Sequence, residues 1–185
     1  EKHLERARKI VKENLSKETL ISGFSKVGTV VGIDLINSIG GLATRNHSTG
    51  VWDGIDKLGS NTYKEKYHVK DGGCYKCPVR CWKINRVEKG EFAGVENDGP
   101  EYESTYALGT ECGVSNPESI ILADRLCDEY GMDTLSCGVT IAWAMECYEK
   151  GLITKEDTGG LELKFGNYRA QLEIIRKIAF RQGIG

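Results

Sequence analysis

The sequence predicts an all-α fold: a mainly helical domain with one irregular, cysteine-bearing loop and a short β-hairpin beside it. Three observations favour this fold class. Long stretches repeat apolar residues at the helical spacing of three and four positions. Two consecutive segments, 116–131 and 133–151, carry helix start and stop signals at their ends. Proline, which interrupts helices, occurs at only 3 of 185 positions.

The N-terminal third of the chain contains three expected helices. Residues 3–14 place their apolar side chains on one helical face, formed by Leu4, Ala7, Ile10 and Val11. Residues 25–41 are expected to form one well-buried helix that ends at the glycine pair 40–41, because glycine adopts the left-handed conformation that terminates helices. Residues 53–67 favour a weaker helix.

The segment after the cysteine cluster is expected to form a hairpin and then a helix. In residues 82–95, side chains of alternating character surround a turn at Lys89 and Gly90, which is typical of a short hairpin. Residues 99–113 are expected to form a helix with Pro100 at its first position, since proline lacks the N–H that this position leaves unpaired.

The C-terminal half carries the strongest helix signals. Asn116 is the expected N-cap of one helix, and Gly131 ends it. Asp133 is the expected N-cap of the next helix, which closes at Gly151. Residues 168–183 have the pattern of a last amphipathic helix.

The composition is that of an ordinary globular protein. Hydrophobic residues make up 39%, charged residues 28%, and the net charge is -2, so no basic excess indicates a nucleic-acid partner. No window approaches the roughly 18 apolar residues of a membrane helix. The N-terminal stretch "EKHLERARKIVKEN" is too charged for a secretory signal, which favours a cytoplasmic protein. We expect residues 1–185 to be a single helical domain taken from a longer chain.

Three cysteines crowd into the stretch "DGGCYKCPVRCWK". Cys74, Cys77 and Cys81 have the spacing C-x2-C-x3-C, and soft thiolates select zinc, copper(I) or iron–sulfur clusters. A structural zinc site usually has a second ligand pair, which the scattered histidines do not supply: His3, His47 and His68. The pattern therefore favours a [4Fe-4S] cluster, with a zinc site and no metal as the alternatives.

Four further cysteines lie outside this cluster. They fall mostly within apolar helical patterns and are expected to be small buried residues rather than ligands: Cys112, Cys127, Cys137 and Cys147. Because the total of seven is odd and no secretory signal is evident, the sequence disfavours a disulfide scaffold and favours a reducing compartment.

Several stretches around the cysteine motif resemble one known family. "GLATRN" (41–46), "GPEYESTYALGTECGV" (99–114), "LCDEYGMDTLSCG" (126–138) and "FGNYRAQLEIIRKIAFRQGIG" (165–185) together resemble the tungsten-dependent aldehyde ferredoxin oxidoreductases. The resemblance covers nearly the whole chain, but only the middle of a family member. It implies that an N-terminal pterin-binding sheet domain and a C-terminal domain lie outside this chain.

The resemblance implies roles for the cysteine cluster. Cys74, Cys77 and Cys81 would supply three ligands of a [4Fe-4S] cluster, and the fourth thiolate would come from the later domain. Cys112 or Cys127 would replace it only if the fold brought that residue near the loop.

The resemblance also implies a cofactor-binding turn. Asp128 to Asp133 looks like the D-x-x-G-x-D pterin motif of the family, with the carboxylates of Asp128 and Asp133 and the backbone of Met132 facing the ligand. Carboxylates accept hydrogen bonds only, which suits the N–H donors of a pterin. A simpler interpretation is that Gly131 stops one helix and Asp133 caps the next.

Glu103, in "PEYES", is the candidate catalytic acid/base, because it matches a glutamate close to the metal in the family. Glu101 is less favoured, since it lies two residues away on another helical face. Either glutamate would also suit the positive end of a helix dipole without any catalytic role. Trp143 and Met145 are expected in the core.

The activity implied by the resemblance is oxidation of a small aldehyde with water to a carboxylate. Two electrons would pass through a tungsten or molybdenum bis-pterin to the cluster and then to ferredoxin. Two alternatives stay open: reduction of aromatic acyl thioesters by the same architecture, and a non-enzymatic zinc or interaction module. The chain alone is expected to be inactive.

Overall fold

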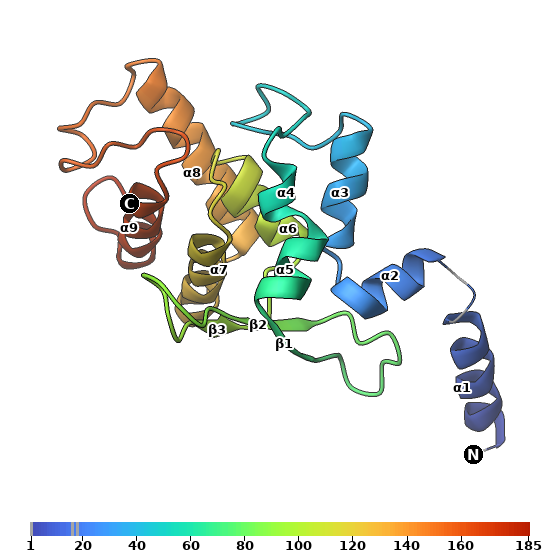
Figure 1. Cartoon of the computed structure of the whole chain (residues 1–185). Coiled ribbons are helices and arrows are strands. Elements are labelled where there is room, and N and C mark those ends of the chain that lie inside the picture. The colour runs from blue at the N-terminus through green and yellow to red at the C-terminus, as the bar shows by residue number, and fades with distance from the viewer. Residues whose placement is uncertain (1, 16, 18) are drawn as a thin grey trace.

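Helices make up most of the computed structural model, which describes residues 2–15, 17 and 19–185 (Figure 1). Glu1, included in the expected domain, lies outside the described residues. The elements in chain order are α1 (Lys2–Leu15), α2 (Thr19–Val27), α3 (Val31–Ser38), α4 (Ile55–Leu58), α5 (Ser60–Lys66), β1 (His68–Asp71), β2 (Lys83–Arg86), β3 (Glu96–Asn97), α6 (Tyr102–Thr105), the π-helical turn η1 (Tyr106–Thr110), α7 (Pro117–Tyr130), α8 (Thr134–Glu149) and α9 (Tyr168–Phe180). The predicted fold class is confirmed.

The strongest sequence signals match the structure closely. The side chain of Asn116 accepts a hydrogen bond from the N–H of Ser119 at 3.1 Å and caps α7. Gly131 ends this helix with φ +66°. Asp133 caps α8 by accepting a hydrogen bond from the N–H of Ser136 at 2.7 Å.

Two predicted helices are each divided in the structure by a glycine. The predicted helix 25–41 contains only the end of α2 and the whole of α3, which are separated at Gly28 with φ +81°. α2 begins earlier, at Thr19, and α3 ends at Ser38. The segment 53–67 forms α4 and α5, which are separated at Gly59, where the backbone is extended. At this break, the side chain of Asp34 in α3 accepts a hydrogen bond from the N–H of Ser60 at 3.1 Å. Tertiary contacts override the helical pattern at both breaks.

The predicted helix 99–113 begins two residues later than expected. Gly99–Pro100 is a cis peptide, and α6 starts at Tyr102, so Pro100 precedes the helix instead of opening it. The backbone then widens into η1, where the N–H of Glu111 donates to the carbonyl of Tyr106 at 3.0 Å. Gly113 has φ +68° and ends the segment as predicted.

A hairpin is present, but its second strand lies just beyond the predicted segment 82–95, and its connection is longer than a tight turn. β2 pairs antiparallel with β3 through Asn85 opposite Asn97 and Arg86 opposite Glu96, and residues 87–95 connect the strands. The sequence interpretation missed β1, which pairs with the other edge of β2 to give the order β1-β2-β3. The cysteines therefore lie in the connection between two paired strands.

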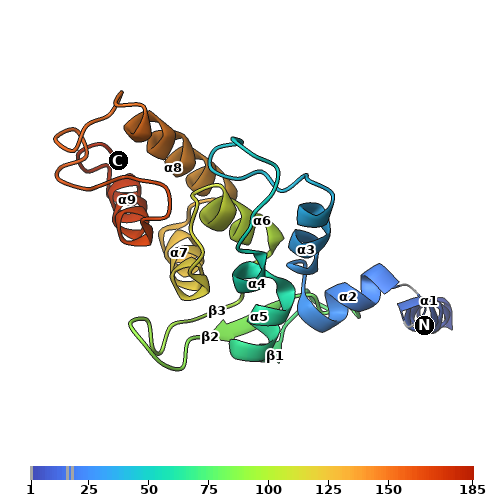
Figure 2. The same ribbon diagram turned by 45° about the horizontal axis from the view of Figure 1, so that its top comes forward.

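The core lies where η1, α7, α8 and α9 pack together (Figure 2). Its fully buried side chains include Leu108, Ile120, Ile121, Ile141, Met145 and Ile175. Met145 is in the core as predicted, but the prediction for Trp143 is wrong: its side chain is 57% exposed, because the α8 face that carries it has no packing partner among the described residues.

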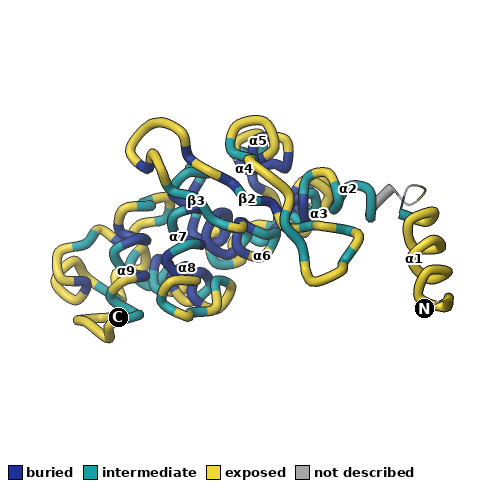
Figure 3. The backbone as a smooth tube through the Cα atoms, turned by 90° about the horizontal axis from the view of Figure 1, so that it is seen from below, coloured by how far each residue is buried: buried dark blue, intermediate teal, exposed yellow. Residues whose placement is uncertain are grey.

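Helix α1 forms where its periodicity predicts it, yet none of its residues is buried (Figure 3). Its apolar face does not join the core, and Leu4, Ile10 and Val11 are largely exposed. No helix among the described residues has the length and apolar character needed to cross a membrane.

Candidate metal and cofactor site

The three clustered cysteines lie in the loop that joins β1 to β2. The N–H of Gly72 donates to the carbonyl of Trp82 at 3.0 Å and closes the base of this loop. The buried ammonium of Lys83 donates to the carboxylate of Asp71 at 2.7 Å and to the carbonyl of Ser25 at 2.8 Å. Hydrogen bonds therefore join the two ends of the loop to each other and also to α2.

Within the loop the chain turns tightly around the thiols. The N–H of Cys77 donates to the carbonyl of Cys74 at 3.0 Å, and Lys76 and Arg80 have left-handed backbones with φ +57° and +53°. Cys74 is exposed, whereas Cys77 and Cys81 are half-buried. The turns keep all three thiols on one short, solvent-facing segment.

The three thiols are neighbours, but they do not close on one point. Burial raises the pKa of the Cys81 thiol, and the charges of Glu101, Cys77 and Cys74 raise it further. No group of three or more Cys, His, Asp and Glu side chains among the described residues is arranged to hold a metal ion. Three thiols have the chemistry of iron–sulfur ligands. In the described part of the chain, however, their side chains are not arranged as a metal site.

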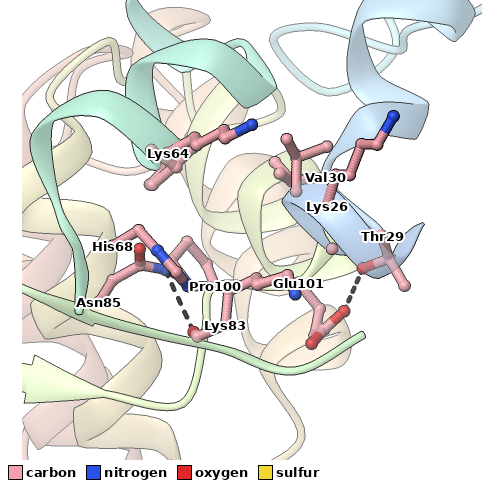
Figure 4. Close-up of a pocket in the computed structure, with 12 residues that line it drawn as sticks. Lys26, Thr29, Val30, Lys64, His68, Lys83, Asn85, Pro100 and Glu101 are labelled. Carbon is pink, nitrogen blue, oxygen red and sulfur yellow. Dashed lines mark hydrogen bonds between the residues drawn. The ribbon is translucent and has the colours of Figure 1, made fainter. Parts of the chain in front are cut away.

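The two candidate glutamates occupy different environments. Glu103 is exposed in the first turn of α6. Glu101 is half-buried, and burial raises its pKa despite a hydrogen bond donated by the hydroxyl of Thr29 (Figure 4). The same hydroxyl accepts a hydrogen bond from the N–H of Tyr102 at 2.9 Å. Sequence reasoning missed this contact, because Thr29 is 72 positions away from Glu101.

A small cavity of about 10 Å³ lies beside Glu101 (Figure 4). Its wall includes His68, Lys83, Asn85 and Pro100. The buried Asn85 donates its amide N–H to the carbonyl of Gly99 at 2.7 Å, while its amide oxygen has no hydrogen-bond partner among the residues that the structure describes. The half-buried carboxyl of Glu101 therefore borders a small cavity with a polar wall.

The predicted pterin-binding turn joins α7 to α8. The carboxylate of Asp128 is exposed and accepts a hydrogen bond from the side chain of Asn97 at 3.0 Å. The N–H of Met132 donates to the carbonyl of Cys127 at 2.8 Å, so this donor belongs to the end of α7. Hydrogen bonds from Ser136 hold the pKa of Asp133 below its usual range. The N-cap role of Asp133 is thus real, and its carboxylate is charged at neutral pH.

Helix α6 connects the cysteine loop to this turn. On one side, the backbone of Gly28 packs against Cys81, and the adjoining Thr29 holds Glu101. On the other side, the hydroxyl of Ser104 donates to that of Thr134 at 3.0 Å, next to Asp133. A line of contacts therefore runs from the backbone carbonyl of Cys81 in the cysteine loop, through the start of α6, to the α7–α8 turn.

Two substitutions at Asp133 distinguish the stability that its helix cap gives from any effect of its negative charge. We expect Asp133→Ala to lower the melting temperature of the chain by a few degrees, because α8 loses its cap. Asp133→Asn should leave it nearly unchanged at pH 7, since asparagine caps as well as aspartate. Thermal unfolding followed by circular dichroism measures both, with Asn116→Ala at the α7 cap as the comparison. Equal losses for the two Asp133 variants would contradict a pure capping role.

Comparison with known proteins identifies the family. Residues 3–185 match the family model described as aldehyde ferredoxin oxidoreductase, domains 2 and 3. The chain belongs to the aldehyde ferredoxin oxidoreductase family. It is 42% identical over 177 residues to a tungsten-containing aldehyde ferredoxin oxidoreductase of Pyrococcus abyssi and 40% identical over 164 residues to that of Thermococcus kodakarensis. The family resemblance seen in the sequence is confirmed.

The matches also show how much of each relative's length this chain covers. The match to the Pyrococcus abyssi protein covers 94% of this chain but only 28% of that protein's length. The match to the Thermococcus kodakarensis protein covers 88% of this chain and 26% of that protein's length. The chain thus spans about a quarter of the curated relatives it matches. It is also 38% identical over 126 residues, covering 68% of this chain and 19% of the relative, to an aliphatic sulfonate oxidoreductase, WOR-like subunit, of Pyrococcus furiosus.

Proposed function

We propose that this chain is the helical middle part of an oxidoreductase that oxidises small aldehydes to carboxylates and passes the electrons to ferredoxin. The N-terminal pterin-binding sheet domain and the C-terminal domain lie outside it in this proposal. Family membership supports the reaction class. The observation that carries the site is the line of contacts from the cysteine loop through α6 to the α7–α8 turn.

Cys74, Cys77 and Cys81 hold three corners of a [4Fe-4S] cluster in this proposal. A fourth thiolate comes from outside the chain, because Cys112 and Cys127 are fully buried in the helical core. Loop backbone N–H groups that face the cluster would raise its reduction potential. Trp82, 40% exposed at the end of the loop, lies against Gly72 and shields one side of it from water.

Asp128, Met132 and Asp133 form one edge of a tungsten or molybdenum pterin site in this proposal. The two exposed carboxylates accept hydrogen bonds from the N–H groups of a pterin, and Met132 presents the backbone of the same turn. Bound there, the metal would supply Lewis-acid activation of an oxygen and accept the electrons.

The chain's own acid/base chemistry is assigned to the start of α6. Glu103 is the exposed carboxylate that can reach a substrate and take up a proton. Glu101 is the second candidate, favoured by the burial that raises its pKa. The charge of Glu103 raises the pKa of Glu101 further.

The cluster assignment is tested by anaerobic reconstitution of the chain with ferrous iron, sulfide and a small thiol to occupy the fourth position. We expect bound iron and an electron paramagnetic resonance signal after reduction. Cys77→Ser should lose most of both, because the loop then offers only two thiolates. The matched control is Cys147→Ser, which removes a half-buried thiol of α8 and should change neither. One equivalent of zinc without an iron signal would support the zinc module instead.

The variants Glu103→Gln and Glu101→Gln, made in the full-length protein, distinguish which of the two glutamates acts as the acid/base. We expect Glu103→Gln to lower kcat on the order of 100-fold, which is typical for loss of a general acid/base. Glu101→Gln should cost less. The reverse order would assign proton transfer to Glu101. Assays with aldehydes, aromatic acyl thioesters and aliphatic sulfonates identify the substrate class.

A further inference from the structure

Thr29, in the connection between α2 and α3, lies against the start of α6. Its hydroxyl accepts a hydrogen bond from the N–H of Tyr102 at 2.9 Å and donates one to the carboxylate of Glu101. Glu101 is the N-cap residue of α6, yet its own side chain makes no capping hydrogen bond. Thr29 therefore helps to cap α6 from 73 positions away, because it satisfies one of the N–H groups that the first turn of a helix leaves free.

The single hydrogen of the Thr29 hydroxyl fixes the direction of both contacts. The oxygen accepts from Tyr102, so the hydrogen is left for Oε2 of Glu101. Figure 4 shows the carboxylate of Glu101 turned toward Thr29. In the described part of the chain, Oε1 of Glu101 accepts no side-chain hydrogen bond. The contact thus anchors one carboxylate oxygen and leaves the other free to take up a proton.

Glu101 has no cationic partner within the residues that the structure describes. The titratable side chains that line the same cavity are Lys26, Tyr63, Lys64, His68 and Lys83. None of them forms an ion pair with Glu101, and His68 and Lys83 pair with Asp71 instead. The hydroxyl of Thr29 is therefore the group that holds this half-buried carboxylate in place.

We propose that Thr29 is a positioning residue, which holds the carboxylate of Glu101 away from α6 and keeps it available for proton transfer. Without this contact, an acidic side chain at the N-cap would turn to the free N–H groups of its own helix. The contact between the two side chains does not depend on the proposed function. Only proton transfer by Glu101 rests on that function.

The test on the chain of residues 1–185 uses Thr29→Val, which keeps the shape of the side chain and removes the hydroxyl. We expect amide hydrogen exchange of Tyr102 to quicken several-fold. The carboxyl carbon NMR signal of Glu101, identified by its loss in Glu101→Gln, should shift. Thr29→Ser should restore both. The matched control is Thr105→Val, which removes a buried hydroxyl of α6 without a hydrogen-bond partner among the described residues and should change neither readout.

Glu101→Gln is the second variant in case Thr29→Val does not fold, which circular dichroism checks. The amide of Tyr102 should stay protected in Glu101→Gln, because its acceptor is the hydroxyl of Thr29. Loss of protection in this variant, or unchanged readouts in a folded Thr29→Val chain, would overturn the proposal.

Steady-state kinetics of the full-length protein measure the consequence for proton transfer. We expect Thr29→Val to lower kcat several-fold with KM nearly unchanged, and Thr29→Ser to restore it. In the Glu101→Gln background, Thr29→Val should have no further effect, because the two residues act as a unit. An equal loss of kcat in that background would contradict the proposal and leave Thr29 a purely structural role. If the full-length protein does not oxidise aldehydes, the proposed function fails, whereas the exchange and NMR results still decide whether Thr29 positions Glu101.

Discussion

Gly138→Ala is expected to lower the free energy of unfolding by about 2 kcal/mol, because α8 touches η1 through this glycine. A Cβ at position 138 would lie 2.5 Å from the carbonyl carbon and 2.6 Å from the carbonyl oxygen of Ala107. Overpacking of this kind costs up to about 3 kcal/mol. The better helix propensity of alanine offsets about 1 kcal/mol of this loss of stability. The clash therefore dominates.

The matched control is Gly23→Ala in α2. A Cβ there would meet only the side chain of Val31, at an ordinary 3.6 Å, so the variant should be stabilised by up to about 1 kcal/mol. Chemical denaturation followed by circular dichroism measures both variants. A Gly138→Ala chain as stable as the Gly23→Ala chain would mean that α8 does not pack this closely against η1.

Asp124→Asn is expected to stabilise the chain at pH 7 by about 2 to 3 kcal/mol, because the native state buries this carboxyl. Burial raises the pKa of Asp124 from 3.8 to about 6, and the charges of Asp128 and Asp98 add to the effect, while the hydrogen bond donated by the side-chain amide of Asn97 at 2.9 Å opposes it. Each unit of difference between the folded and unfolded pKa corresponds to about 1.4 kcal/mol.

The sign follows from proton binding. Below about pH 4 both states hold the proton, and the wild-type carboxyl costs no stability. Between about pH 4 and 6 the unfolded chain releases its proton first, so wild-type stability falls as the pH rises, and above pH 6 the loss is complete. Asp124→Asn cannot titrate. Its advantage over wild type should therefore grow from near zero at pH 4 to its full value at pH 7, as measured by urea denaturation across this range. A constant difference would refute a raised pKa at Asp124.

The residues proposed for the site could be recognised in the sequence wherever they are close together in the chain. The spacing of Cys74, Cys77 and Cys81 and the motif from Asp128 to Asp133 each occupy one short segment, so their chemistry can be read locally. The partners of those segments were not predictable. Thr29 holds Glu101 across 72 positions, and Ser104 contacts Thr134 across 30, and no local pattern encodes such pairs.

Sequence alone determined the helices whose ends carry their own signals. Asn116, Gly131 and Asp133 cap α7 and α8 through hydrogen bonds and backbone conformations that depend only on near neighbours. Only the tertiary structure decided where the helical pattern breaks, at Gly28 and Gly59, because each break is held by contacts with a distant segment. It also decided which acidic groups are buried, since burial at Glu101 and Asp124 comes from packing between elements that no periodicity brings together.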